Sequence, residues 1–211
     1  MVEKILKAKH WQIFILMIGI PLVFQIFMML TMFSDLDTDS NPDHKKIIGI
    51  FQFFPVIMIL YISVFFSWFW SIGIGLQNKV PASIKMKIKK FKIFFFIPLI
   101  YITLLSIGMG ISFSGYSFSN NFFPNNLGLM LPLIILPLHL FSMFCMFYML
   151  YFCSKTIKTV ELQKEVSFGE FIGEFFSLWF YPIGIWFIQP KINKLAKKIE
   201  EIQDIGKNDN I

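Results

Sequence analysis

Hydrophobic positions along this chain gather in four long blocks instead of alternating with polar positions. Each block lacks Lys, Asp and Glu and reaches the roughly 20 residues that a helix needs to cross about 30 Å of hydrocarbon. The expected spans are residues 11–33, 47–76, 93–113 and 127–153. The sequence therefore predicts an all-α integral membrane protein, with a four-helix transmembrane bundle over residues 1–153.

The polar connections between the blocks differ in charge. The 77–92 connection contains six lysines and no acid, and further lysines stand before the first block and directly after the fourth. The 34–46 connection carries four aspartates, and the 114–126 connection carries no charge. Because lysine-rich connections stay in the cytoplasm, four spans put all the lysine-rich segments on one side. We expect N- and C-termini in the cytoplasm.

Residues 154–211 are expected to form a tail on the cytoplasmic side. Ser167 and Glu170 have the spacing of a capping box, so a short helix should begin there. Lysines flank this helix on both sides, which disfavours a crossing. We predict an interfacial or re-entrant segment over 167–190, and a fifth span is the alternative. The spacing of apolar residues predicts an amphipathic surface helix over 191–205.

Composition narrows the class of partner. Hydrophobic residues make up 56% of the chain and charged residues 15%, against about 25% in soluble domains. The net charge is +6, and all 19 basic residues counted in it are lysines, because the sequence has no arginine. Arginine is the usual residue for bidentate phosphate recognition, so nucleic acid is not expected. The lipid bilayer is the expected partner, with anionic headgroups bound by the cytoplasmic lysines.

Few polar side chains interrupt the predicted spans, and they are the first candidates for a site. The main ones are Gln25, Gln52 and His139. An ionisable group inside a span is a functional hypothesis by default, so His139 is a candidate proton-relay or substrate group. The interpretation we favour is an imidazole bonded either to a carbonyl freed by Pro137 or to another helix.

Glu170 and Glu174 are the acids embedded in apolar sequence, one helical turn apart. Three roles fit this spacing: binding a cation, pairing with a lysine of the 77–92 connection, or facing water. We favour a solvated face for both glutamates.

Motifs for chemistry are otherwise absent from the sequence. There is no HExxH, CxxC, GxSxG, P-loop or GxGxxG pattern. Asp35, Asp37 and Asp39 have the spacing that opens an EF-hand loop, but Ser40 and Lys46 stand where that loop needs Gly and Glu. No enzyme activity, cofactor or metal is expected.

Two further patterns bear on origin and architecture. The run FYPIGIWFIQPKIN (180–193) resembles a stretch near the C-terminus of small uncharacterised bacterial multi-pass membrane proteins. This resemblance implies a bacterial inner (cell) membrane and no particular activity. Residues 7–15 and 87–95 share a pattern, and Pro-Leu follows each, which hints at two tandem helical hairpins.

Three hypotheses for function follow. The favoured one is a non-enzymatic membrane subunit, anchor or regulator, either a homo-oligomer or bound to another membrane protein. The alternative is a small transporter or channel built from the two tandem hairpins. The third is an enzyme acting on lipids through Glu170 and Glu174, for which the sequence supplies no nucleophile or metal ligands.

Overall fold

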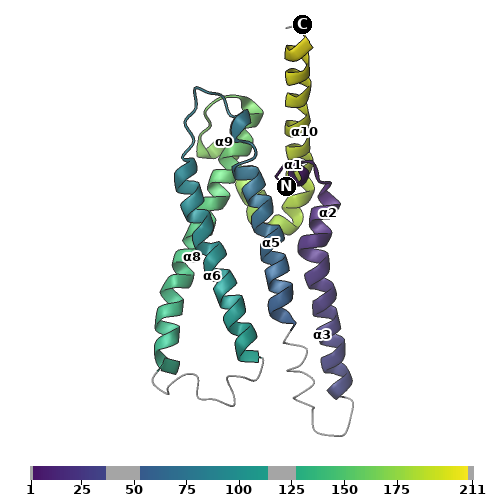
Figure 1. Cartoon of the computed structure of the whole chain (residues 1–211), viewed down its shortest axis with the longest axis vertical. Coiled ribbons are helices and arrows are strands. Elements are labelled where there is room, and N and C mark those ends of the chain that lie inside the picture. The colour runs from purple at the N-terminus through teal and green to yellow at the C-terminus, as the bar shows by residue number, and fades with distance from the viewer. Residues whose placement is uncertain (1, 37–52, 114–126, 209–211) are drawn as a thin grey trace.

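The computed structural model describes residues 2–36, 53–113 and 127–208, and the regular structure within these ranges is helical (Figure 1). The elements in chain order are α1 (Val2–Lys7), α2 (His10–Phe14), the π-helical turn η1 (Ile15–Gly19), α3 (Ile20–Leu36), α5 (Phe54–Gly73), the 3-10 turn η2 (Gln77–Lys79), α6 (Ile88–Phe113), α8 (Leu127–Leu162), α9 (Phe168–Trp179) and α10 (Tyr181–Asn208).

Four helices among the described residues are long and apolar enough to cross a membrane. They cover His10–Thr31, Phe54–Lys79, Ile88–Ile111 and Leu133–Leu162. They coincide with the four predicted blocks, so the all-helical class and the four candidate spans are confirmed. Residues 47–52 of the second predicted block lie outside the described residues.

The fourth helix is longer than predicted. We expected it to end near residue 153, but α8 continues to Leu162. The lysines in this extension meet acids that offset their charge: Nζ of Lys158 lies 2.9 Å from Oε2 of Glu161. The helix ends at Gln163, whose φ of 52° is left-handed and whose side-chain amide donates to the carbonyl of Val160 at 2.7 Å.

Helix α5 is the centre of the molecule and packs against α1, α6 and α8. Its residues Trp68, Phe69 and Ile72 are at most 1% exposed. The ring of Phe91 on α6 fits directly over Gly73, where a Cβ would collide with it. Phe91 also stacks on Phe152 of α8 at a centroid distance of 4.5 Å, which joins all three helices.

Helices α9 and α10 form an antiparallel pair, which we call the C-terminal hairpin. Helix α9 ends at Trp179, and after Phe180 helix α10 begins at Tyr181 and returns toward the end of the molecule where α9 began (Figure 1). A Cβ on Gly184 would collide with the backbone of Ser177, so glycine permits this close turn. The turn lies beside Tyr61, about 18 Å along α5 from Gly73 at 1.5 Å per residue.

Helix α10 also differs from expectation. We placed a boundary between a segment ending at residue 190 and a helix over 191–205, but α10 runs unbroken through Pro190 to Asn208. Proline removes one backbone donor from a helix interior. The helix tolerates this loss because Gln189 and Ile192, both fully buried, hold it on either side of the proline.

Candidate functional site

Four charged side chains from three helices meet where the C-terminal hairpin packs on α8. Oε1 of Glu174 (α9) lies 3.3 Å from Nζ of Lys158 (α8) and 2.7 Å from Nζ of Lys191 (α10). Oε2 of Glu161 (α8) lies 2.9 and 2.7 Å from the same two ammonium groups. We call these residues the four-charge cluster. Its two carboxylates and two ammonium groups balance, so it joins three helices without leaving a net charge.

Glu174 is the most buried member of the cluster, with 7% of its surface exposed. Burial by itself raises the pKa of this carboxyl, but hydrogen bonds from Lys191 and Lys158 outweigh that effect and bring the pKa below its usual value. The carboxyl is therefore held ionised and has no proton to donate. This geometry suits a structural clamp between helices.

The two glutamates singled out in the sequence have different surroundings. The favoured expectation that Glu174 faces water is wrong, and its partners do not come from the 77–92 connection. Glu170 lies 2.7 Å from Nζ of Lys164 and accepts the backbone N–H of Ser167 at 2.7 Å. The ammonium of Lys164 and this backbone donor together lower the pKa of Glu170 to about 2. Glu170 thus caps α9, as the sequence predicted.

Gln189 is a buried amide that connects three segments far apart in the sequence. Its Oε1 accepts the indole N–H of Trp68 on α5 at 2.8 Å. Its Nε2 donates toward the carbonyl oxygens of Ile5 and Ala8 at 3.0 and 2.9 Å. Asn193, one turn further along α10, donates to the same Ala8 carbonyl at 3.1 Å. The amide therefore fastens the N-terminal segment and α10 to α5.

Gln189 was not among the candidate residues predicted from the sequence. The available signal was an isolated amide inside the apolar run before Pro190. A buried amide needs partners for its donors and its acceptor, so this position pointed to a polar contact. Nothing in the local sequence pointed to Trp68 or to the N-terminal carbonyls.

A pair of tyrosines marks the turn of the C-terminal hairpin. The hydroxyl of Tyr61 donates to that of Tyr181 at 2.9 Å. Both tyrosines line two grooves. One, of about 220 Å³, lies toward Phe147 on α8, and the other, of about 390 Å³, lies toward Gln25 on α3. Both grooves are lined mainly by apolar side chains, so they suit hydrocarbon better than a polar solute.

The polar residues predicted inside the spans do not form one site. Gln25 is exposed on α3 and lines the larger of these two grooves. Nδ1 of His139 on α8 lies 3.3 Å from the hydroxyl of Tyr101 on α6, which is the contact with another helix that we favoured. Helices α3 and α8 lie on opposite sides of the molecule (Figure 1). Gln52 lies outside the described residues.

Metal ligands are also not assembled in the described part of the chain. No group of three or more His, Cys, Asp or Glu side chains able to hold a metal ion occurs there. Asp37 and Asp39 of the EF-hand-like spacing lie outside it. The fold thus defines an all-helical protein with four helices able to cross a membrane. No family model, curated protein or solved structure matches this chain.

Proposed function

We propose that this chain is a non-enzymatic multi-pass membrane protein, a subunit or anchor that presents α10 on the cytoplasmic side of a bacterial inner membrane. The observation that carries the proposal is the contrast between the two halves of α10. Its first half is fastened into the molecule, and its second half extends as a continuous helix beyond the other elements (Figure 1).

Polar contacts with several other segments attach α10 as far as Ala196. Gln189 binds the N-terminal carbonyls, and Lys191 belongs to the four-charge cluster. Nζ of Lys79, from the connection after α5, donates to the carbonyl oxygens of Leu195 and Ala196 at 3.3 and 3.1 Å. A helix held at its base in this way has a defined direction, which favours presentation to a protein partner.

The orientation rests on the placement of lysine. Helix α1, the connection from α5 to α6 and the C-terminal end of α10 lie toward one end of the molecule (Figure 1). These segments carry many of the lysines, and the positive-inside rule assigns such an end to the cytoplasm. The same lysines suit anionic headgroups at that surface.

The C-terminal hairpin is, in this proposal, a re-entrant element. Its turn reaches about halfway along α5, at Tyr61, and then returns. Phe180, Ile183 and Phe187 near the turn are 60 to 68% exposed. Large apolar side chains exposed to this degree suit lipid better than water.

Purification of the full-length protein in mild detergent tests the proposal. We expect its mass, from light scattering after size exclusion, to show a homo-oligomer or a stoichiometric complex with one other protein. A chain ending at Lys197 should lose this assembly, whereas a control chain ending at Asn208 should keep it. A monomer without a partner for the full-length protein, or an assembly unaffected by the truncation, would contradict the proposal.

The other two hypotheses gain no supporting observation. A transporter built from tandem hairpins needs polar groups that converge, but Gln25 and His139 lie on separate pairs of helices. An enzyme acting on lipids through Glu170 and Glu174 needs reactive carboxyls, and both are held in ion pairs.

A further inference from the structure

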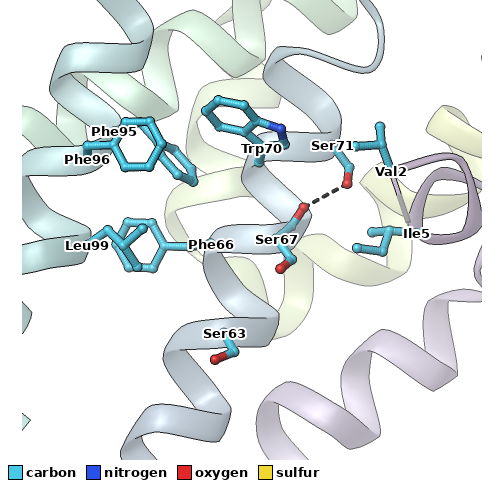
Figure 2. A pocket seen from close by; sticks show the side chains of 10 residues that line it. All are labelled: Val2, Ile5, Ser63, Phe66, Ser67, Trp70, Ser71, Phe95, Phe96 and Leu99. Carbon is cyan, nitrogen blue, oxygen red and sulfur yellow. Dashed lines mark hydrogen bonds between the residues drawn. The ribbon is translucent and has the colours of Figure 1, made fainter. Parts of the chain in front are cut away.

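A groove of about 590 Å³ lies on the face of α5 that is turned toward α1 and α6 (Figure 2). Aromatic and aliphatic side chains from α5 and α6 form one wall, Val2 and Ile5 of α1 form the other, and three serines of α5 lie between them. The lining residues are Val2, Ile5, Ser63, Phe66, Ser67, Trp70, Ser71, Phe95, Phe96 and Leu99. We call it the α1–α5–α6 groove.

The small serine side chains leave space in the groove without making it a polar site. Ser63, Ser67 and Ser71 are four residues apart, so their small side chains follow one face of α5. The hydroxyl of Ser63 donates to the carbonyl of Ile59 at 2.7 Å. That of Ser71 donates to the carbonyl of Ser67 at 2.7 Å (Figure 2). Two of the three hydroxyl donors are therefore bonded within the helix. The groove, whose other lining residues are apolar, is suited to a hydrocarbon chain.

Basic groups lie beyond one end of this groove. Lys92 is exposed on α6, and its Nζ lies 6.0 Å from the centre of the Trp70 ring, which lines the groove. Lys89 is also exposed and precedes Lys92 by three positions. Phe96 follows Lys92 by four, so these side chains share one face of α6. Along this face of α6, the ammonium groups come first and the apolar wall of the groove follows.

We propose that the α1–α5–α6 groove binds one acyl chain of an anionic phospholipid whose phosphate is held by Lys92 and Lys89. The arrangement matches such a lipid, because the lysines at the start of α6 suit its phosphate and the apolar groove further along α6 suits its acyl chain. Phe96, which lines the groove, is 45% exposed, so a lipid chain has access from the side. The site is separate from α10 and does not depend on the function proposed for that helix.

Native mass spectrometry of the full-length protein, released from detergent after titration with phosphatidylglycerol or phosphatidylcholine, tests the lipid site. We expect one phosphatidylglycerol to be retained preferentially. Lys92→Gln should reduce the preference for phosphatidylglycerol about fivefold, the effect of one lysine near a membrane surface. Lys90→Gln is the matched control, because Lys90 lies over the rings of Phe94 and Tyr148, which do not line the groove.

Ser67→Phe tests the acyl-chain part of the site separately. Filling the groove should weaken retention of both lipids by at least about tenfold, because each displaced methylene loses its apolar contact. Leu104→Phe, at a 63% exposed position of α6, adds a ring outside the groove and should leave retention unchanged. Lipid-free thermal unfolding in the same detergent separates a loss of binding from a loss of fold.

Three results would overturn the proposal. The first is equal loss of preference in Lys92→Gln and Lys90→Gln, which would show general surface attraction. The second is displacement of the lipid by millimolar sodium phosphate, which would show an anion site without an acyl chain. The third is full retention by a folded Ser67→Phe variant.

Discussion

The hydroxyls of Tyr61 and Tyr181 form a 2.9 Å hydrogen bond across 120 positions of sequence. This bond joins the turn of the C-terminal hairpin to the middle of α5. Both tyrosines also line the two grooves that flank the turn.

Removing either hydroxyl should weaken the hairpin without unfolding the protein. Tyr61→Phe and Tyr181→Phe should each lower the free energy of unfolding by about 1 kcal/mol, the usual net value of one hydrogen bond. The double variant should cost little more than either single one, since the two changes remove the same bond. Denaturant unfolding in mixed micelles measures all three. Additive losses would show that the two hydroxyls do not act as a pair.

The four-charge cluster should depend on its central carboxylate. Glu174→Gln leaves two ammonium groups with one carboxylate in a partly buried site. We expect a loss of about 2 kcal/mol, below the value for fully buried pairs because both lysines are partly exposed. Glu165→Gln is the control, because that side chain is 75% exposed and lies 3.5 Å from Lys155. This substitution should lower the free energy of unfolding only slightly. Equal effects in the two variants would argue against a clamp at Glu174.

Acidification should loosen α9. The pKa values of Glu170 and Glu174 are lower in the folded protein than their usual 4.5, and that of Glu170 is about 2. Groups with a depressed folded pKa contribute stability above the unfolded pKa and lose it as pH falls through the folded value. Protection of α9 amides from hydrogen exchange, corrected for intrinsic rates, should therefore decline between about pH 4.5 and about pH 2. Glu170→Gln should flatten part of this decline, and an unchanged profile would contradict the assignment.

Gln189 should control the N-terminal segment. Gln189→Leu leaves the indole N–H of Trp68 and the carbonyls of Ile5 and Ala8 without the amide. A loss of about 2 kcal/mol follows from leaving the buried indole N–H unpaired, since the carbonyls of Ile5 and Ala8 keep the N–H of Ala8 and the amide of Asn193 as donors. Faster hydrogen exchange over residues 2–8 is the specific sign of this role. Gln12→Leu is the control, because the exposed Gln12 accepts only a local bond from the N–H of Lys9 at 2.9 Å.

The turn of the hairpin should not accept a larger residue at Gly184. Gly184→Ala places a methyl group against the backbone of Ser177 and should cost about 3 kcal/mol or more, at the upper end of overpacking effects. Gly169→Ala is the matched control, since a Cβ there meets no atom within 4 Å. It should be neutral or slightly stabilising because alanine favours a helix. Thermal unfolding of both variants in one detergent tests the contrast.

Sequence reasoning was accurate where the physical cause is local. The four candidate spans follow from the lengths of the apolar blocks, because the free energy of moving a segment into hydrocarbon accumulates residue by residue. The cap of α9 follows from Ser167 and Glu170, which lie three residues apart and need no distant partner. The end of α8 was not predicted: the expected span stops with the apolar block at residue 153, whereas the helix continues to Leu162, and its lysines there pair with acids on α8, α9 and the adjoining connection.

The helical class, the four candidate spans and the start of α9 therefore follow from the sequence alone. Three contacts depend on how the helices pack: Glu174 is buried between two lysines, Gln189 binds the N-terminal carbonyls, and Tyr181 bonds to Tyr61. A periodic pattern shows which face of a helix is polar, but it does not show which distant group lies opposite. That pairing depends on how the helices pack, and so the polar contacts that join the C-terminal hairpin to the rest of the protein appear only in the folded chain.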